Sequence, residues 1–218
     1  MNIGNVFHRL VTWMPRAVHR KGFGVQSPWA YELVRDVFFE RMPYYAFERL
    51  RRQAGRVDGS GMWRRHNERL FRIANYMRPS SIVDVNDGCL AGILYLSSPH
   101  SHIPCTLVSN SEKTSFLEEM FRGNVCSGNH LSVLQSLFSD GGHIGLLRIG
   151  DTDDAGSIYD WAAAHADNHS VVILENLPEN AGLWKRIVAD ERAVITFDFY
   201  RWGMIVFDRK RVKQNYLL

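Results

Sequence analysis

The sequence predicts an α/β protein, with a mostly parallel β-sheet, an antiparallel last strand and a helical segment before the sheet. Residues 1–80 carry apolar side chains at helical spacing, whereas from residue 81 onward short β-branched runs alternate with helical stretches. The last two β-branched runs, 193–200 and 203–207, are too close in sequence for a parallel crossover and should form a hairpin. We therefore expect a helical N-terminal cap over residues 1–80 and a sheet domain over residues 81–218.

The first 21 residues combine basic side chains with an apolar stripe. Arg9, Arg16, Arg20 and Lys21 all precede the first acidic residue, Glu32. A basic amphipathic helix of this kind is typical of contact with an anionic membrane surface or a partner protein. The alternative is a helix that packs its apolar stripe on its own domain.

Further helices fill the rest of the N-terminal segment. Ser27 and Pro28 are typical of an N-cap and a first helical position, and Pro43 and Pro79 end the helices before them. The helices expected here span residues 28–41, 44–55 and 63–77.

The sheet domain should begin with a strand at residues 82–85, followed by a tight turn and a helix. Asn86 to Gly88 has turn chemistry, and an apolar run resumes beyond the small residues Ala91 and Gly92. Arg148 interrupts the apolar fourth strand, where it should snorkel, pair with a carboxylate, or mark a less buried sheet. The other strands expected before the hairpin are 105–108, 131–134, 144–149 and 171–174, with helices at 112–122, 136–139, 157–166 and 179–189.

Composition excludes several classes of protein. Among 218 residues, 45% are hydrophobic and 22% charged, which is incompatible with a disordered chain. No apolar run approaches the roughly 18 residues of a membrane span, and no signal peptide is evident, so we expect a cytoplasmic protein. The net charge of +3 is too small to indicate nucleic-acid binding. Cys89, Cys105 and Cys126 fit neither a zinc site nor a disulfide framework, so they should be reduced.

The stretch from Asp84 to Gly92 resembles the first motif of class I S-adenosylmethionine (SAM)-dependent methyltransferases, an acidic residue followed by alternating glycines. Asp84 and Gly88 match this motif, whereas Asn86 and Leu90 stand where glycines are expected. The segment Gly22–Tyr31 and the C-terminal part with its Lys213–Tyr216 segment look like a bacterial subfamily of methyltransferase-like proteins. The resemblance implies a Rossmann-like, mostly parallel seven-stranded sheet with an antiparallel last strand, and SAM as the cofactor.

The resemblance also implies roles for individual residues. Ser109 stands at the end of the second strand, where an acidic residue would accept both ribose hydroxyls of the cofactor. Gly150 stands where an Asp near the transferred methyl group is expected, so Asp151 is the candidate catalytic residue. Cation-dependent O-methyltransferases are similar too, and they imply a Mg²⁺ site formed by Asp151, Glu175 and Asn176. The implied cofactor-binding residues are Asp84, Asn86, Asp87, Gly88 and Ser109.

The sequence is compatible with three functions. The first is a methyltransferase-like protein, active or catalytically impaired, that acts on an unknown small-molecule or protein acceptor. The second is a non-enzymatic binding or scaffolding module, because the departures at Asn86, Leu90, Ser109 and Gly150 all fall on positions that should face the cofactor. The third is a cation-dependent O-methyltransferase with a small hydroxylated acceptor. Leu90 should crowd the cofactor and Ser109 should weaken its ribose contact, so we expect SAM to bind weakly or not at all.

Overall fold

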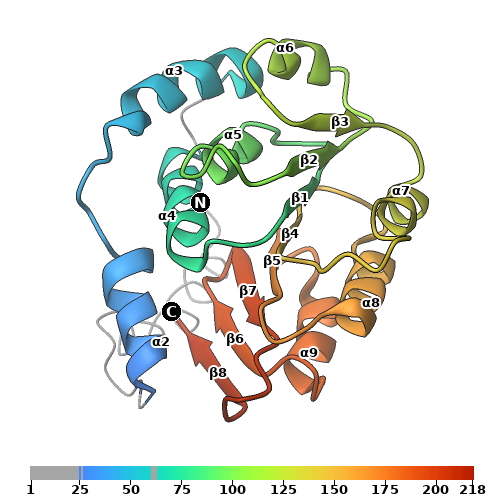
Figure 1. The fold of residues 1–218 in the computed structure, drawn as a ribbon. Helices are drawn as coiled ribbons and strands as arrows, with labels where there is room; N and C mark the ends of the chain where they lie inside the picture. The colour runs from blue at the N-terminus through green and yellow to red at the C-terminus, as the bar shows by residue number, and fades with distance from the viewer. Residues whose placement is uncertain (1–24, 26, 60–62) are drawn as a thin grey trace, which may run out of the picture.

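A computed structural model describes residue 25 and residues 27–59 and 63–218 (Figure 1). The basic amphipathic helix expected within residues 1–21 lies outside the described residues. The described chain forms an eight-stranded sheet in the order β3-β2-β1-β4-β5-β7-β6-β8. Helices cover both faces of this sheet, which confirms the predicted α/β, Rossmann-like class.

The sheet is parallel except for β7. As predicted, β7 pairs antiparallel with both β5 and β6. The sheet has one strand more than expected, because the residues after the hairpin return to pair with β6 in parallel as β8. The strands are β1 Ile82–Val85, β2 Cys105–Val108, β3 Asn124–Cys126, β4 Leu146–Ile149, β5 Val171–Glu175, β6 Ile195–Asp198, β7 Trp202–Val206 and β8 Gln214–Leu217.

One face of the sheet is covered mainly by helices from the N-terminal segment. Ser27 is an N-cap, as its sequence context predicts: it accepts a hydrogen bond from the Ala30 N–H, and Pro28 occupies the first helical position. The single helix expected over residues 28–41 is instead a short α-helix that continues as a π-helix. The helices of this layer are α2 Pro28–Leu33, η1 Val34–Phe38, α3 Ala46–Asp58, α4 Arg64–Met77 and α5 Gly92–Ser97.

The opposite face carries three helices, and one expectation fails here. Residues 131–134, expected as a strand, lie in a helix whose N-cap is Asn129; its side chain accepts a hydrogen bond from the Ser132 N–H. The third strand comes earlier, at 124–126, and is short and partly exposed. The three described helices of this face are α7 His130–Leu137, α8 Ala155–His165 and α9 Ala181–Ala189. The short helix α6 Thr114–Glu118 instead packs its Leu117 in the core shared with the N-terminal helices.

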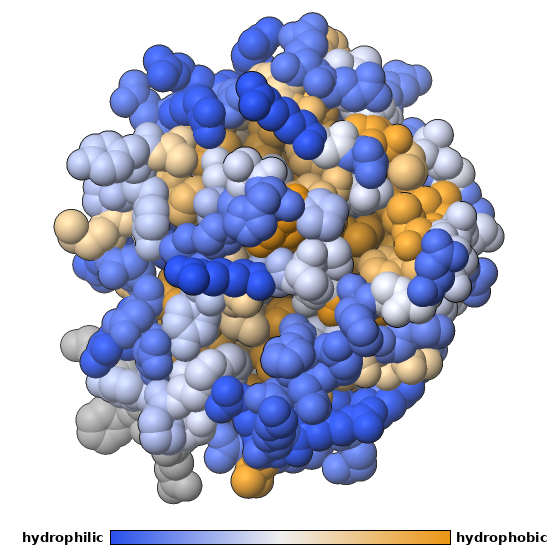
Figure 2. Space-filling model, in the orientation of Figure 1, coloured by the Kyte–Doolittle hydropathy of each residue, from blue (hydrophilic) through white to orange (hydrophobic). Residues whose placement is uncertain are grey.

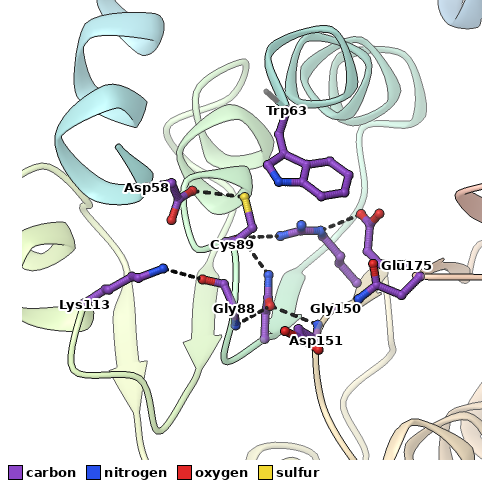
Figure 3. A pocket seen from close by; sticks show the side chains of 11 residues that line it. Asp58, Trp63, Gly88, Cys89, Lys113, Gly150, Asp151 and Glu175 are labelled. Atoms are coloured by element: carbon purple, nitrogen blue, oxygen red, sulfur yellow. Dashed lines mark hydrogen bonds and ion pairs between the residues drawn. The ribbon is translucent and has the colours of Figure 1, made fainter. Parts of the chain in front are cut away.

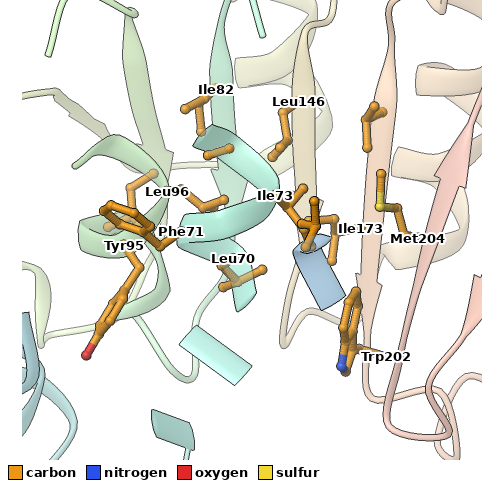
Figure 4. Packing of buried hydrophobic residues seen from close by; sticks show 14 of the residues in the cluster. Leu70, Phe71, Ile73, Ile82, Tyr95, Leu96, Leu146, Ile173, Trp202 and Met204 are labelled. Carbon is orange, nitrogen blue, oxygen red and sulfur yellow. The ribbon is translucent and has the colours of Figure 1, made fainter. Parts of the chain in front are cut away.

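The sheet separates two hydrophobic cores because strand side chains alternate between its faces. Ile82, Leu146 and Ile173 belong to the same buried cluster as Leu70 and Ile73 of α4 (Figure 4). Their chain neighbours pack on the other side with α7, α8 and α9. The described N-terminal helices therefore share a core with the sheet. Some of them also lie over the edge of the sheet at the carboxyl ends of the strands.

No helix in the described ranges is both long and apolar enough to cross a membrane. Polar and charged side chains cover most of the face shown in Figure 2. Cys89, Cys105 and Cys126 are all free thiols, in agreement with the sequence prediction.

Candidate functional site

A crevice of about 310 Å³ opens at the carboxyl ends of β1, β4 and β5, under the end of α3 and the start of α4 (Figure 3). This volume is at the lower end of the roughly 300–1,000 Å³ typical of small-molecule sites, and in open α/β sheets this edge is the usual ligand site. The crevice is lined by Asp58, Trp63, Asn86, Gly88, Cys89, Lys113, Arg148, Gly150, Asp151, Glu175 and Asn176.

A buried ion-pair network forms the floor of the crevice. Asp84 of β1 is the register partner of Arg148 of β4 in the sheet. Both side chains lie on the face of the sheet that α4 covers. Arg148 donates from Nη1 to Asp84 Oδ2 and from Nε to Glu175 Oε1, each at 2.9 Å. His66 of α4 joins through its Nε2, 2.7 Å from the same Glu175 oxygen. The charged residues of this network are 0–5% exposed, so the pairing alternative raised for Arg148 is correct.

The pKa values of the two carboxyl groups in this network, Asp84 and Glu175, shift in opposite directions. Complete burial raises the pKa of Asp84 to about 6, even though Arg148 opposes the rise. Asp84 also keeps one buried oxygen, Oδ1, without a hydrogen-bond partner among the described residues. Burial acts on Glu175 too, but His66 and Arg148 together outweigh it and lower the pKa of Glu175 to about 2. Glu175 is therefore the firmly ionised partner of Arg148.

The side chain of Asp58, the last residue of α3, reaches the turn that follows β1. Gly59 ends α3 in the left-handed region at φ 74°, which leaves Asp58 as the last helical residue. Its carboxylate accepts from the backbone N–H groups of Leu90 (3.2 Å) and Ala91 (2.9 Å) and from the Cys89 thiol (3.1 Å). Burial and Asp58 raise the pKa of the Cys89 thiol to about 12, so this thiol stays protonated and donates.

Asn86 fills the space that a glycine would leave open at the end of β1. It is 1% exposed, and its Oδ1 accepts from the N–H groups of both Gly88 and Asp151 at 3.0 Å. Its Nδ2 donates to the Cys89 carbonyl at 2.7 Å. Gly150 is required beneath it, because a Cβ at Gly150 would lie 2.3 Å from Asn86 Cγ. Asn86 thus ties the first turn to the end of β4.

Gly88, the glycine that matches the motif, is also covered by the protein itself. A Cβ at Gly88 would lie 2.6 Å from Asp151 Oδ2, so the Asp151 side chain packs directly against it. Asp151 is exposed at the rim of the crevice, and its carboxylate has no hydrogen bond or ion pair with the rest of the described chain.

Asp87 and Ser109 lie outside the crevice, in a second polar cluster at the ends of β1 and β2. Asp87 Oδ1 accepts from the Ser109 hydroxyl (3.2 Å) and from the Asn110 N–H (2.6 Å). Asp87 Oδ2 lies 3.2 Å from His130 Nε2, and His130 Nδ1 lies 3.1 Å from Asp154 Oδ1. The groups at this end of the sheet therefore bond to one another.

Leu90 does not crowd the crevice, and that expectation is wrong. The side chain is 0% exposed and belongs to the core beneath the N-terminal helices. Leu90 is not one of the residues that line the crevice. Crowding comes instead from Asn86 and Asp151.

The three residues proposed for a metal, Asp151, Glu175 and Asn176, do line one crevice. Glu175 Oε1, however, already accepts one hydrogen bond from Arg148 Nε and lies 2.7 Å from His66 Nε2. Over the described ranges, the structure has no group of three or more His, Cys, Asp or Glu side chains arranged to hold a metal ion. The metal site stays a prediction.

Several residues of the site were not predicted as site residues from sequence. Asp58, Trp63 and His66 come from the N-terminal helices, and Lys113 comes from the loop before α6, where its Nζ donates to the Gly88 carbonyl at 3.2 Å. The one available signal was Arg148, a charge inside an apolar strand that needs buried partners.

The fold is similar to that of solved methyltransferases at low sequence identity. The O-methyltransferase TomG from Streptomyces achromogenes, in complex with SAM, matches with a TM-score of 0.58 and 13% identity, covering 78% of this chain and 92% of that one. An O-methyltransferase from Bacillus cereus, in complex with S-adenosylhomocysteine (SAH), gives 0.56 and 15%, covering 89% and 99%. The MycE methyltransferase of the mycinamycin biosynthetic pathway, in complex with Mg and SAH, gives 0.53 and 11%, covering 100% and 60%.

No family model and no curated protein matches the sequence. At these identities the likeness shows the fold, which is that of class I SAM-dependent methyltransferases.

Proposed function

From this fold and this crevice, we propose that the chain is a methyltransferase-like protein that binds a small ligand without using SAM as an active enzyme does. The observation that carries the proposal is the self-occupied turn after β1. Asp58 holds the N–H groups of Leu90 and Ala91, and Asn86 holds those of Gly88 and Asp151. A cofactor carboxylate would find these donors already engaged.

The nucleoside end of the expected cofactor site supports the same proposal. Asp87 and Ser109 are bonded to each other, and Ser109 offers a neutral hydroxyl in place of a carboxylate. Losing a charge-assisted hydrogen bond costs about 1.5–3 kcal/mol, or roughly ten- to a hundredfold in affinity. The residues present do not fit SAM at either end, so we derive no methyl-transfer step for this site.

One observation favours an active methyltransferase as the second candidate. Asp151 presents an exposed, unbonded carboxylate beside Gly88 at the edge of the sheet where ligands bind. In that case Asp151 would position the acceptor, as its place after β4 suggests. The cation-dependent variant receives less support, because Glu175 is held by Arg148 and His66.

Calorimetric titration with SAH tests the proposal. We expect no saturable binding in the micromolar range by the unmodified protein, and a measurable gain by an Asp58→Ala, Asn86→Gly double variant, because four N–H groups are released. Asp153→Ala is the matched control, since Asp153 lies exposed in the same loop as Asp151 without lining the crevice. Micromolar binding of SAH by the unmodified protein would overturn the proposal and restore the enzyme.

A further inference from the structure

The donors and the acceptors of the crevice are used unequally. The turn N–H groups are taken by Asp58 and Asn86. Arg148 is matched by two carboxylates, and Lys113 donates to the Gly88 carbonyl. A ligand that brings a carboxylate or phosphate therefore meets donors that are already engaged.

Two acceptor groups of the crevice, in contrast, are not engaged by the described chain. The Asp151 carboxylate has no partner in the described part of the chain. Glu175 is 5% exposed and uses Oε1 for Arg148 and His66, whereas no bond within the described ranges involves Oε2. Unlike Asp84 Oδ1, this second oxygen is not among the fully buried unpaired atoms, so it keeps some accessible surface in a residue that lines the crevice.

The balance of charge points the same way. Among the described residues, three carboxylates and two cations line the crevice, and Arg148 is also offset by Asp84 beneath it. The lining is therefore net negative, and low-dielectric walls strengthen such a field at a cleft. The Trp63 indole lies across the crevice above these groups (Figure 3), and an aromatic face attracts cations.

From these contacts we infer that the crevice takes an organic ammonium ligand: a primary amine carrying a small aliphatic body. The ammonium group donates to Asp151 and to Glu175 Oε2, and the body lies against the Trp63 indole. This inference rests on the proposed function, because it names the ligand class of the same crevice. Asp58 and Asp151 act as specificity-determining residues, the first by excluding an anion from the turn and the second by receiving the cation.

A matched probe series tests the ligand class. Butylammonium, butanol and butyrate are four-carbon aliphatic molecules of similar size that differ in charge. Each is titrated into the full chain at constant ionic strength while the indole N–H resonances are followed by NMR, with Trp63→Leu used to assign the resonance of Trp63. We expect saturable shifts of that resonance with butylammonium and weaker or no shifts with butanol and butyrate.

Two variants locate the binding group. Asp151→Asn should weaken butylammonium binding roughly ten- to a hundredfold, because a charge-assisted hydrogen bond is lost. Asp153→Asn, with the same change of charge two residues away, should leave it within about twofold. Butyrate binding as tightly as butylammonium, no saturable butylammonium shift, or equal effects of the two variants would each overturn the inference. Titration with SAH distinguishes failure of this inference from failure of the proposed function, because the proposed function fails only if SAH binds tightly.

Discussion

Replacing Arg148 with methionine would keep a long side chain and remove the charge between Asp84 and Glu175. Both carboxylates are at least 95% buried, and each accepts a 2.9 Å hydrogen bond from the guanidinium. Removing one partner of a buried ion pair typically costs about 3–5 kcal/mol, because uncompensated charge remains. We expect a loss of this size in the free energy of unfolding, which is a large part of the roughly 5–15 kcal/mol that stabilises a typical protein.

The loss should depend on pH in a defined direction. In the native protein the pKa of Asp84 is raised to about 6, so the folded state binds more protons than the unfolded chain between about pH 4 and 6. Stability from Asp84 is thus fully present below pH 4 and falls as pH rises through 6, by up to about 3 kcal/mol. Glu175, with its pKa lowered to about 2, has the opposite effect below about pH 4. The Asp84→Asn variant should flatten the slope between pH 4 and 6.

Urea unfolding followed by circular dichroism at pH 5 and pH 8 measures both effects. Arg148→Met should be more destabilising at pH 8, because the stranded carboxyls can protonate at pH 5. Adding Asp84→Asn and Glu175→Gln should recover roughly half of the loss or more. The matched control is Arg186→Met, whose 2.6 Å pair with Asp160 is about half exposed and should contribute less than about 1 kcal/mol. If Arg148→Met were no more destabilising than this control, the reasoning about the buried network would be refuted.

Three further predictions concern packing and the N-terminal segment. Gly150→Ala should destabilise by about 1–3 kcal/mol, because the new Cβ lies 2.3 Å from Asn86 Cγ, and Asn86→Ala should relieve it; unchanged melting of the single variant would contradict this. Leu90→Ala should cost about 2–5 kcal/mol and leave butylammonium binding intact, since the side chain lies in the core and not in the crevice; an altered affinity with normal stability would count against it. The full chain should float with anionic vesicles better than residues 22–218, and equal recovery would exclude a membrane role for residues 1–21.

Local sequence signals were sufficient for most of the fold. The short connection between the last two β-branched runs required a hairpin, and the apolar runs placed β1, β2, β4 and β5. The third strand was missed because residues 124–126 are partly exposed and lack a continuous apolar pattern. The 131–134 run was taken for a strand although Asn129 caps a helix there, so capping chemistry outweighed the apolar run.

The candidate site was harder to predict because several of its residues come from segments that are distant in the sequence. Asp58 lies more than thirty positions before the turn that it contacts, and no local sequence spacing predicts a hydrogen bond between residues so far apart. Leu90 was misjudged because sequence gives the position of a residue in a motif but not the direction of its side chain. Arg148 was visible as an anomaly, yet only the sheet register shows that Asp84 is level with it.

The buried network also constrains how this sequence can change over generations. One guanidinium, that of Arg148, pairs with the two carboxylates of Asp84 and Glu175. Replacing one of these three residues by a neutral one is therefore damaging while the other two are still charged, and harmless once the other two are neutral. Intermediates that keep one or two of the three charges should be purged by selection. We therefore expect related chains either to retain an acidic residue, an arginine and an acidic residue at the positions of Asp84, Arg148 and Glu175, or to have neutral residues at all three. Such joint inheritance would identify, from sequence alone, the relatives that share this crevice.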